Sequence, residues 1–499
     1  MKDRSQQRSS RFLDFDMAAR FVLGLILASL LPAFAQRAEA AAPLNIVLIL
    51  ADDLGAHDLG CYGADLHETP NIDRLAREAV RFTQAYAPSP VCSPTRAALL
   101  TGKHPARLHL TIWSEGSHNG PTNRMLLQAH SLHDLPHTET TLAKRLQSAG
   151  YLTALVGKWH LGDADHSPET HGFDANIGGT HWGAPTTYFW PYRGAGRFGS
   201  EFRFVPHLEL GKPGEYLTDR LTDEALRVID RVAEAKQPFF LFLAYHAPHT
   251  PIEAKSNDIA RFEKKLRPGF NHQNSAYAAM VKSIDDSVGR VLARLKRLGL
   301  DRSTLVIFAS DNGGYLGTDK RQTVPVTSNA PLRSGKGALY EGGLRVPLIV
   351  KWPGVTPAGA ECGEAVVLTD LFYTLAAATG LPKSMNSPPD GVDLSVLWRK
   401  PNAKLDRDAL FFHYPHYYHA PPSTPACAVR AGPWKLIEYF EDNRVELYNL
   451  RDDPGEQRDL ARAQPETADR LRQQLRDWRK QVSAAMPAPN AGFNPQENR

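Results

Sequence analysis

The chain has 499 residues, of which 42% are hydrophobic and 22% are charged, a balance typical of folded globular proteins. Its formal net charge of +4 is small for this length and no long basic run occurs, which argues against a nucleic-acid partner. Four cysteines are too few for a disulfide scaffold, although Cys362 and Cys427 could pair in an oxidising compartment.

Residues 1–40 have the features of a secretory signal. A basic start precedes an apolar run at 21–31, and small residues follow in the pattern of a cleavage site. The run is shorter than the roughly 20 residues that a membrane span needs, and an uncleaved anchor is the alternative. We therefore expect an exported protein, periplasmic or extracellular, with no stable membrane span.

Apolar runs and amphipathic stretches alternate after this segment. The runs predict strands buried on both faces, at residues 44–50, 151–157, 238–245, 303–310 and 346–352. Capped or amphipathic stretches between them predict helices at residues 69–80, 138–150, 218–236 and 276–299. This alternation predicts a large α/β domain with a mainly parallel sheet at residues 43–385.

The last part of the chain has a different pattern. Turn-forming residues at 380–393 indicate a joint. Short strand-like segments then predict a small antiparallel sheet, and residues 466–482 predict a helix that packs on it. We expect a C-terminal subdomain at residues 386–485 and a disordered tail at residues 486–499.

Two acidic clusters directly follow predicted strands. Asp52 and Asp53 follow the first strand, and Asp311 and Asn312 follow the strand at 303–310. Because ligands of open parallel sheets bind beyond the carboxyl ends of the strands, we expect one shared site. Carboxylate and amide oxygens suit Ca²⁺ or Mg²⁺ better than zinc. The alternative is that both clusters only form turns, but neighbouring buried acids repel unless a cation or proton intervenes.

Cys92 lies where an extended stretch gives way to a predicted helix. Pro94 suits the first helical turn, so the thiol would lie at a helix N-terminus, where N–H groups and the helix dipole favour anions. Arg96, one turn further on, can point toward the same anion. The residues leave two interpretations open: an activated thiol nucleophile, or a buried structural cysteine.

The segment at residues 92–104, CSPTRAALLTGKH, resembles the signature of the type I sulfatases: Cys-x-Pro-x-Arg, then a helix, then Thr-Gly. Further segments are similar to the same family in the same order: NIVLILADDLG, GYLTALVGKWHLG, HAPHTP, VIFASDNGG and GKGALYEGGLRVP. The resemblance covers nearly the whole chain after residue 40. It implies an alkaline-phosphatase-like fold: a large mixed, mainly parallel sheet flanked by helices, with a smaller C-terminal α+β subdomain built on an antiparallel sheet.

The resemblance also implies the site and the reaction. A formylglycine-generating enzyme would oxidise Cys92 to formylglycine, whose hydrate attacks sulfur and carries the sulfate as a covalent intermediate. The other implied roles are Ca²⁺ binding by Asp52, Asp53, Asp311 and Asn312, sulfate binding by Arg96, Lys158 and Lys336, and proton transfer by His160 and His249. Lys336 would assist His249 in protonating the departing alcohol.

Three stretches rich in aromatic residues and histidine, at 104–137, 180–193 and 412–423, would line the substrate pocket, unless they only pack around wide loops. The layout is similar to carbohydrate sulfatases of the arylsulfatase A and N-acetylgalactosamine-sulfatase type. It implies a sulfated saccharide, from a glycosaminoglycan or an algal polysaccharide. Two rivals stay open: a phosphatase or phosphodiesterase of the same superfamily, and a non-catalytic binder of sulfated glycans.

Overall fold

The computed structural model describes residues 43–498 except 119, 198, 320–322, 383–389 and 421. The predicted signal at residues 1–40 lies outside the described residues, as does the middle of the predicted joint. Residues Leu44–Arg499 form one compact unit.

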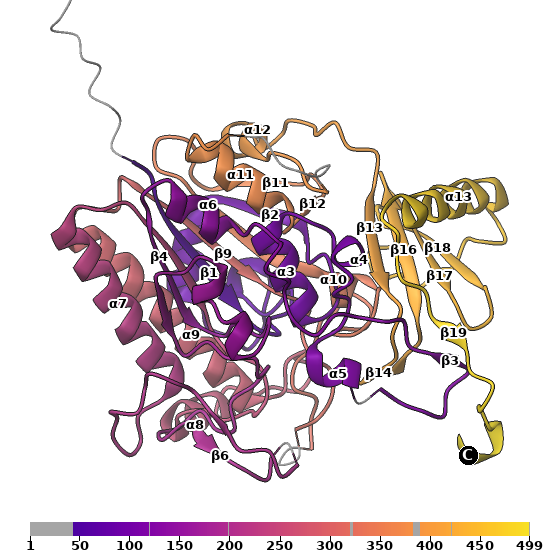
Figure 1. Ribbon diagram of the computed structural model, residues 1–499, viewed down its shortest axis with the longest axis horizontal. Coiled ribbons are helices and arrows are strands. Elements are labelled where there is room, and N and C mark those ends of the chain that lie inside the picture. The colour runs from indigo at the N-terminus through magenta and orange to yellow at the C-terminus, as the bar shows by residue number, and fades with distance from the viewer. Residues whose placement is uncertain are drawn as a thin grey trace, which may run out of the picture. The chain divides into compact units, whose positions relative to one another are not determined.

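A large sheet forms the centre of this unit (Figure 1). Its order is β11 (Ala360–Cys362), β2 (Val80–Tyr86), β10 (Arg345–Lys351), β9 (Thr304–Ser310), β1 (Asn45–Ala51), β8 (Phe239–Ala244), β4 (Leu152–Gly157) and β5 (Ala175–Ile177), with β12 (Val366–Val367) beside β2. β10 runs antiparallel to both of its neighbours, and the other pairs are parallel. The predicted mixed, mainly parallel sheet is therefore confirmed.

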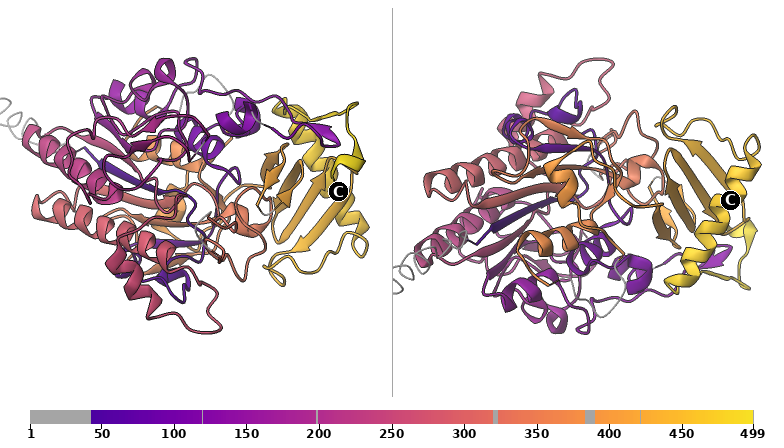
Figure 2. Two further views of the ribbon diagram at one scale, coloured as in Figure 1. Left: turned by 90° about the horizontal axis from the view of Figure 1, so that it is seen from below. Right: turned by 90° about the horizontal axis from the view of Figure 1, so that it is seen from above.

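Helices cover both faces of the sheet, as the two views of Figure 2 show. In β1, Val47 and Ile49 belong to one hydrophobic core, while Ile46 and Leu48 belong to the other. The first core includes α2 (Pro70–Arg77), α7 (Leu217–Ala235), α8 (Ser256–Glu263) and α9 (Ser275–Arg297). The second includes α3 (Cys92–Thr101), α6 (Leu142–Ser148), α11 (Asp370–Ala378) and α12 (Ser395–Arg399). Because both faces of the central strands are buried, apolar residues occupy consecutive positions.

Shorter elements connect these layers. Besides α13 (Pro465–Gln481) of the C-terminal subdomain, the other helices of the described residues are η1 (Gly60–Tyr62), α4 (Pro105–Leu108), α5 (Ser114–His118), η2 (Ala164–His166), η3 (Glu169–His171), α10 (Glu341–Leu344) and η4 (Pro495–Asn498). Three two-stranded ladders pair β3 (Leu126–Leu127) with β19 (Ala488–Pro489), β6 (Arg193–Gly194) with β7 (Arg203–Phe204), and β14 (Tyr418–His419) with β15 (Pro422–Ser423).

The predicted C-terminal antiparallel sheet is present. Its order is β13 (Leu410–Tyr414), β16 (Ala426–Ala431), β17 (Trp434–Tyr439) and β18 (Val445–Asn449), and α13 (Pro465–Gln481) packs on one face. Leu471 and Leu475 of α13 share a core with Val429. The opposite face carries Phe412, which packs with Tyr86 of β2. This arrangement explains why apolar residues alternate between two separate cores along these strands.

Three features differ from the sequence-based expectations. The sequence does not predict β2, because Arg, Thr and Gln interrupt the apolar residues of a strand that lies near the edge of the sheet. All four cysteines are free thiols, so Cys362 and Cys427 do not pair. The segment expected to be a disordered tail instead carries β19, which pairs with β3 through Ala488 and Leu127.

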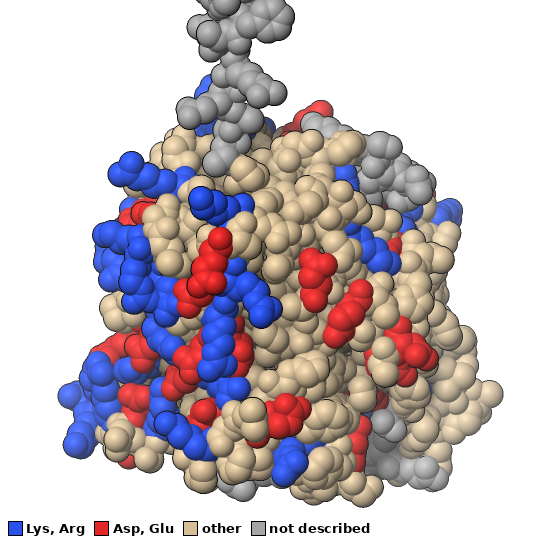
Figure 3. Space-filling model, turned by 60° about the vertical axis from the view of Figure 1, so that its left-hand side comes forward, with Lys and Arg blue, Asp and Glu red and all other residues tan. Residues whose placement is uncertain are grey.

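Basic and acidic side chains lie next to each other on the face shown in Figure 3. Ion pairs between α7 and α9 are of this kind: Arg290 pairs with Asp223, and Arg294 pairs with Asp230. Among the helices of the described residues, none is long and apolar enough to cross a membrane.

Candidate active site

The two acidic clusters meet at the carboxyl ends of β1 and β9. The two strands are adjacent and parallel, with Ala51 opposite Ser310, so the residues that follow them lie side by side. The backbone N–H of Asp53 donates to Asp311 Oδ1 at 3.2 Å, and Asn312 Nδ2 donates to Asp53 Oδ1 at 2.8 Å. The structure thus brings together all four predicted metal ligands, none more than 2% exposed.

Three buried cations surround the carboxylates. Arg96 Nε donates to Asp311 Oδ2 at 2.9 Å, and Lys158 Nζ donates to Asp52 Oδ2 at 2.5 Å. Lys336 Nζ lies 2.7 Å from Asp53 Oδ1. The predicted sulfate-binding residues therefore face the predicted metal ligands, from α3, from the loop after β4 and from the loop before α10.

The electrostatic environment differs between the two neighbouring aspartates. Burial, reinforced by Asp311, raises the pKa of Asp52 well above its usual range despite the nearby Lys158. Burial acts in the same direction on Asp53, but Lys336, His249 and the hydrogen bond from Asn312 together outweigh it and lower the pKa of Asp53 to about 2. Negative charge at Asp52 is therefore only partly compensated by the protein itself.

The cluster of Asp52, Asp53, Asp311 and Asn312 has oxygen atoms that are available to bind a hard cation. Asp52 Oδ1 and Asn312 Oδ1 are buried and have no hydrogen-bond partner within the described part of the chain. Buried acceptors without a partner are costly, and oxygen atoms of this kind are ligands that Ca²⁺ and Mg²⁺ prefer. The three carboxylates and three cations cancel formally, so a divalent cation would leave the site positive and suited to an anionic substrate. The donor set fits the cation that the sequence predicts.

Cys92 lies directly beside this cluster as the first residue of α3, and it is 3% exposed. It lines a cavity of about 330 Å³ together with Asp53, His160, His249 and Lys336. The thiol position is therefore at the N-terminal end of a helix and open to the space above the metal ligands, as the sequence predicts.

His160 is held in a tight loop on the other side of Cys92. Its backbone φ of 62° lies in the left-handed region, and Asp53 has a φ of 64°, a conformation often found at functional sites. Gly183 lies so close that a Cβ atom there would be 2.4 Å from His160 Cε1. Burial, together with Lys158, lowers the pKa of His160 to about 4, so the imidazole is neutral at pH 7.

Comparisons with known proteins agree with this geometry. A family model described as Sulfatase matches residues 44–381, and one described as N-sulphoglucosamine sulphohydrolase, C-terminal, matches residues 335–481. This chain belongs to the sulfatase family. The N-acetylgalactosamine-6-sulfatase of Canis lupus familiaris is 37% identical over 374 residues, 72% of this chain and 66% of that protein. The match thus spans just under two thirds of that relative's length.

Two further relatives match over most of the chain. A sulfatase of Formosa agariphila is 32% identical over an alignment of 526 residues and covers 92% of both chains. The crystal structure of Ps i-CgsB in complex with k-i-k-neocarrahexaose is 30% identical and superposes with a TM-score of 0.72, covering 91% of this chain and 96% of that one. The predicted family and its alkaline-phosphatase-like fold are confirmed.

Both histidines of the HAPHTP segment lie in the site of this family member, although the sequence-based interpretation singles out only His249. His249 Nε2 is 3.6 Å from Asp53 Oδ2, and its Nδ1 is 2.7 Å from the Thr250 carbonyl. His246 is 4% exposed, and neither of its ring nitrogens has a partner among the described residues. Burial, then Lys158 and Arg96, hold the pKa of His246 well below its usual value. The repeated His in a short motif after a buried strand is the signal that could have identified it.

Each of the three aromatic- and histidine-rich stretches contributes to the cavity. Its remaining lining residues include Trp113 and Glu115 from the first, Gly183 and Ala184 from the second, and Tyr418 and His419 from the third, with Arg203, Thr250 and Tyr315. Trp113 and Tyr418 meet edge to face, with ring centroids 5.9 Å apart. Glu115 contacts His160 Nε2 at 3.3 Å and Arg203 at 3.4 Å. Glu115 lies in the first predicted stretch but is neither an aromatic residue nor a histidine, so the prediction does not single it out. Arg203 and Tyr315 lie outside all three stretches, and only the fold brings them to the cavity.

Proposed function

We propose that this chain hydrolyses a sulfate ester of a sulfated saccharide. The observation that carries the proposal is the placement of Cys92 above three buried cations, Arg96, Lys158 and Lys336, that face paired carboxylates. Aromatic residues on the cavity wall, Trp113 and Tyr418, offer surfaces for a sugar ring. The names of two relatives, an N-acetylgalactosamine-6-sulfatase and a protein bound to a neocarrahexaose, support a carbohydrate substrate.

Asp52, Asp53, Asp311 and Asn312 would hold one divalent cation, Ca²⁺ by family resemblance. Their unpartnered oxygen atoms support this assignment. When bound, the cation would supply Lewis-acid stabilisation of the sulfate oxygens and favour ionisation of the attacking hydroxyl. The protein's own part is to fix these ligands at the ends of two paired strands.

Residue 92 would act after conversion to formylglycine by a separate maturation enzyme. One hydroxyl of its hydrate forms the new O–S bond, while the bond from sulfur to the saccharide oxygen breaks. Arg96, Lys158 and Lys336 would stabilise the charge that develops on the sulfuryl oxygens. His160, neutral at pH 7, would then accept the proton of the second hydroxyl, so that sulfate leaves and the aldehyde returns.

His249 would protonate the departing alcohol. Burial and Lys336 hold the pKa of His249 well below its usual value without substrate. A sulfate group beside the ring would raise this pKa, because a nearby negative charge favours the protonated imidazole. Lys336 lies on the same side of the site and assists in the same step.

Maturation and export would precede this chemistry. The signal-like segment at residues 1–40 supports export to the periplasm or the outside of the cell. The Pro94 and Arg96 that follow Cys92 support recognition of the segment by the converting enzyme, as the family resemblance implies.

The test combines peptide mass spectrometry across residue 92 with sulfate release from sulfated galactosamine and galactose oligosaccharides. We expect a formylglycine mass and sulfate release, both abolished in Cys92→Ala. Cys362→Ala is the matched control, since Cys362 is also a buried free thiol and does not line the cavity. Full sulfate release by Cys92→Ala would overturn the mechanism.

Two other outcomes would replace the proposal. Zinc-dependent hydrolysis of a phosphate diester with no sulfate release would make the chain a phosphodiesterase. Tight binding of sulfated saccharides by fully unmodified protein without turnover would make it a glycan binder.

A further inference from the structure

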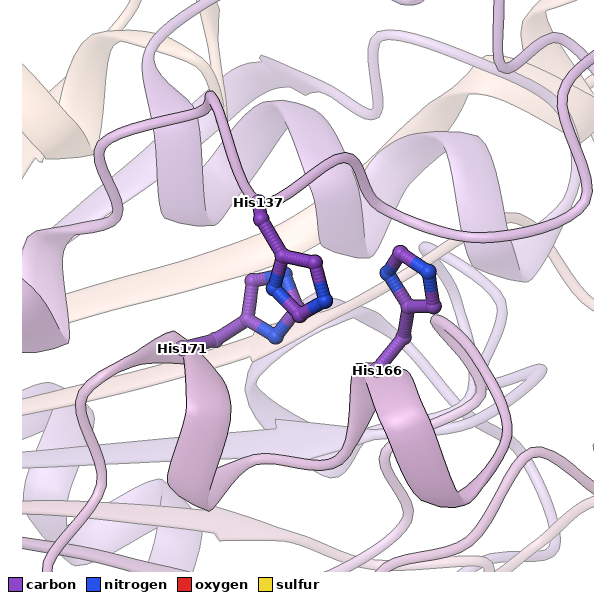
Figure 4. Close-up of side chains that lie close together, drawn as sticks. All are labelled: His137, His166 and His171. Carbon is purple, nitrogen blue, oxygen red and sulfur yellow. The ribbon is translucent and has the colours of Figure 1, made fainter.

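Three histidines, His137, His166 and His171, form a cluster next to the loop after β4 and take no part in the proposed reaction. Figure 4 shows His137 on a loop above His166 and His171, with the three side chains close together. His166 and His171 are the last residues of η2 and η3. One ring nitrogen from each residue lies within 4.8 Å of the other two.

Hydrogen bonds hold the His166 and His171 rings in place, while the His137 ring only stacks against them. The His137 ring stacks on His166 with centroids 4.3 Å apart, and it lies 5.2 Å from the His171 ring. His166 Nδ1 and His171 Nε2 both point at the carbonyl oxygen of Leu135, at 2.8 and 3.0 Å. Two imidazoles therefore converge on one oxygen atom, with a third ring beside them.

The surroundings of the cluster leave room for a cation. Within the described part of the chain, the hydrogen-bond partners of the His166 and His171 rings are backbone carbonyls and the Thr170 hydroxyl, so no carboxylate occupies the space between the rings. Imidazole nitrogens are ligands that suit zinc and copper.

We propose that His137, His166 and His171 bind one divalent transition-metal ion of the zinc type, with the Leu135 carbonyl as a further oxygen ligand. The ion would replace the ring protons that now point at that carbonyl. His137 is exposed, so its side chain has room to rotate toward the ion, and it provides the entry path from solvent. The ligands are nitrogen-rich, unlike the oxygen ligands of the active site, so the two sites select different metals.

The cluster is physically linked to the active site through Trp159. This residue lies between Lys158 and His160, and its indole N–H donates to the His166 carbonyl at 2.8 Å. Its ring also packs against His171, with centroids 5.5 Å apart. A metal bound to the three histidines would therefore restrict the loop that positions Lys158 and His160.

The first experiment measures zinc stoichiometry on tag-free full-length protein in saturating Ca²⁺, which keeps the oxygen site occupied. We expect one Zn²⁺ per chain by equilibrium dialysis with elemental analysis. His137→Ala should weaken binding by more than the roughly 10–100-fold cost of losing an outer-shell partner. His130→Ala is the matched control, because His130 is also an exposed histidine of the same stretch. Equal zinc binding by the two variants, or none by the wild type, would overturn the proposal.

A second measurement adds a variant at another of the three histidines. Co²⁺ in place of Zn²⁺ should give visible d–d bands of nitrogen ligation that are lost in His166→Ala. Zn²⁺ should also slow amide hydrogen exchange in residues 158–166 of the wild type but not of His137→Ala. Unchanged Co²⁺ spectra in His166→Ala would exclude this site, whatever the sulfatase activity of either protein.

Discussion

Two buried charge clusters in this molecule are built differently. In the active site, Asp52 Oδ1 and Asn312 Oδ1 have no hydrogen-bond partner among the described residues. In the second cluster, between α10 and the C-terminal sheet, Lys435 Nζ lies 2.9 Å from carboxylate oxygens of both Glu341 and Glu456. The Tyr86 hydroxyl donates to the other oxygen of Glu341 at 2.7 Å, and the Glu341 N–H donates to the other oxygen of Glu456 at 2.7 Å.

This difference in hydrogen bonding indicates that the active-site cluster binds a ligand, while the Lys435 cluster is a structural contact. Burying a charge is costly, and the cost is offset where the charge is paired and hydrogen-bonded. In the Lys435 cluster one ammonium lies 2.9 Å from two carboxylates, although Glu456 Oε1 accepts no hydrogen bond among the described residues and makes only this ion pair. We infer that this ion-pair cluster joins the C-terminal sheet to the catalytic sheet. The active site leaves acceptors open, and an external cation would complete it. Removing a charge should therefore cost less stability in the active site than in the Lys435 cluster.

The largest expected effect is in the structural cluster. Lys435→Met leaves two buried carboxylates without their cation and should lower the free energy of unfolding by about 3–5 kcal/mol. Urea denaturation measures the change. Lys404→Met is the matched control, since Lys404 pairs with Glu364 but is 83% exposed, and a surface pair contributes about 0–1 kcal/mol. Equal losses in the two variants would remove the distinction between the clusters.

In the active site, Asp52→Asn should separate activity from stability. We expect kcat/KM to fall about 100- to 1000-fold, the scale seen when one preorganised electrostatic group is removed. Measured in chelator, the free energy of unfolding should fall by less than in Lys435→Met, because the loss of the ion pair with Lys158 is partly offset by the removal of repulsion from Asp311. A marked loss of stability in Asp52→Asn would show that the carboxylate is structural.

A third charge cluster, formed by His272, Asp58 and Asp65, should make the free energy of unfolding depend on pH. His272 lies between Asp58 and Asp65, with ring nitrogens 3.1 and 2.6 Å from their oxygens. Although burial opposes it, these carboxylates raise the pKa of His272 to about 9. Protonated His272 therefore stabilises the folded state fully below pH 6.5, its unfolded value, and the contribution disappears as pH rises through 9.

His272→Asn should thus cost about 3 kcal/mol of unfolding free energy at pH 6 and much less above pH 9. Urea denaturation at both pH values provides the measurement, and each value is compared with wild type at the same pH. A cost independent of pH would mean that His272 contributes packing and not charge.

The sequence predicts those parts of the fold that depend on local pattern. β1 and β9 are continuous apolar runs because both of their faces are buried, and their acidic ends follow directly. β2 escapes prediction because its partly exposed positions carry polar residues. The β3–β19 pairing joins residues more than 350 positions apart, and no local pattern encodes such a contact.

The same division holds within the active site. The predicted ligands and cations lie in short motifs attached to strand ends and one helix start, so their meeting follows from the topology of the sheet. Glu115 reaches the cavity from the short helix α5, and Tyr315 reaches it from a loop, and the positions of both segments depend on tertiary packing. The sequence does not single out His246, because His249 alone is enough to match the motif. The structure identifies His246 because both of its ring nitrogens are buried and have no hydrogen-bond partner among the described residues.

The smallest expected effect concerns the cavity wall, where aromatic contact replaces charge. Trp113→Ala should raise KM for a sulfated oligosaccharide about tenfold, equivalent to ~1.4 kcal/mol, because it removes a stacking surface and not a reacting group. kcat should change little. A small aryl sulfate should be cleaved as before, since its binding depends on the three cations of the active site and not on Trp113. Trp352→Ala is the matched control: Trp352 is also half-buried and also meets an aromatic ring edge to face, in Trp398, but it does not line the cavity. A fall in kcat equal to the loss in kcat/KM would show that Trp113 acts in the chemical step. Trp113 would then belong with the charged groups of the active site and not with the residues that only bind the saccharide.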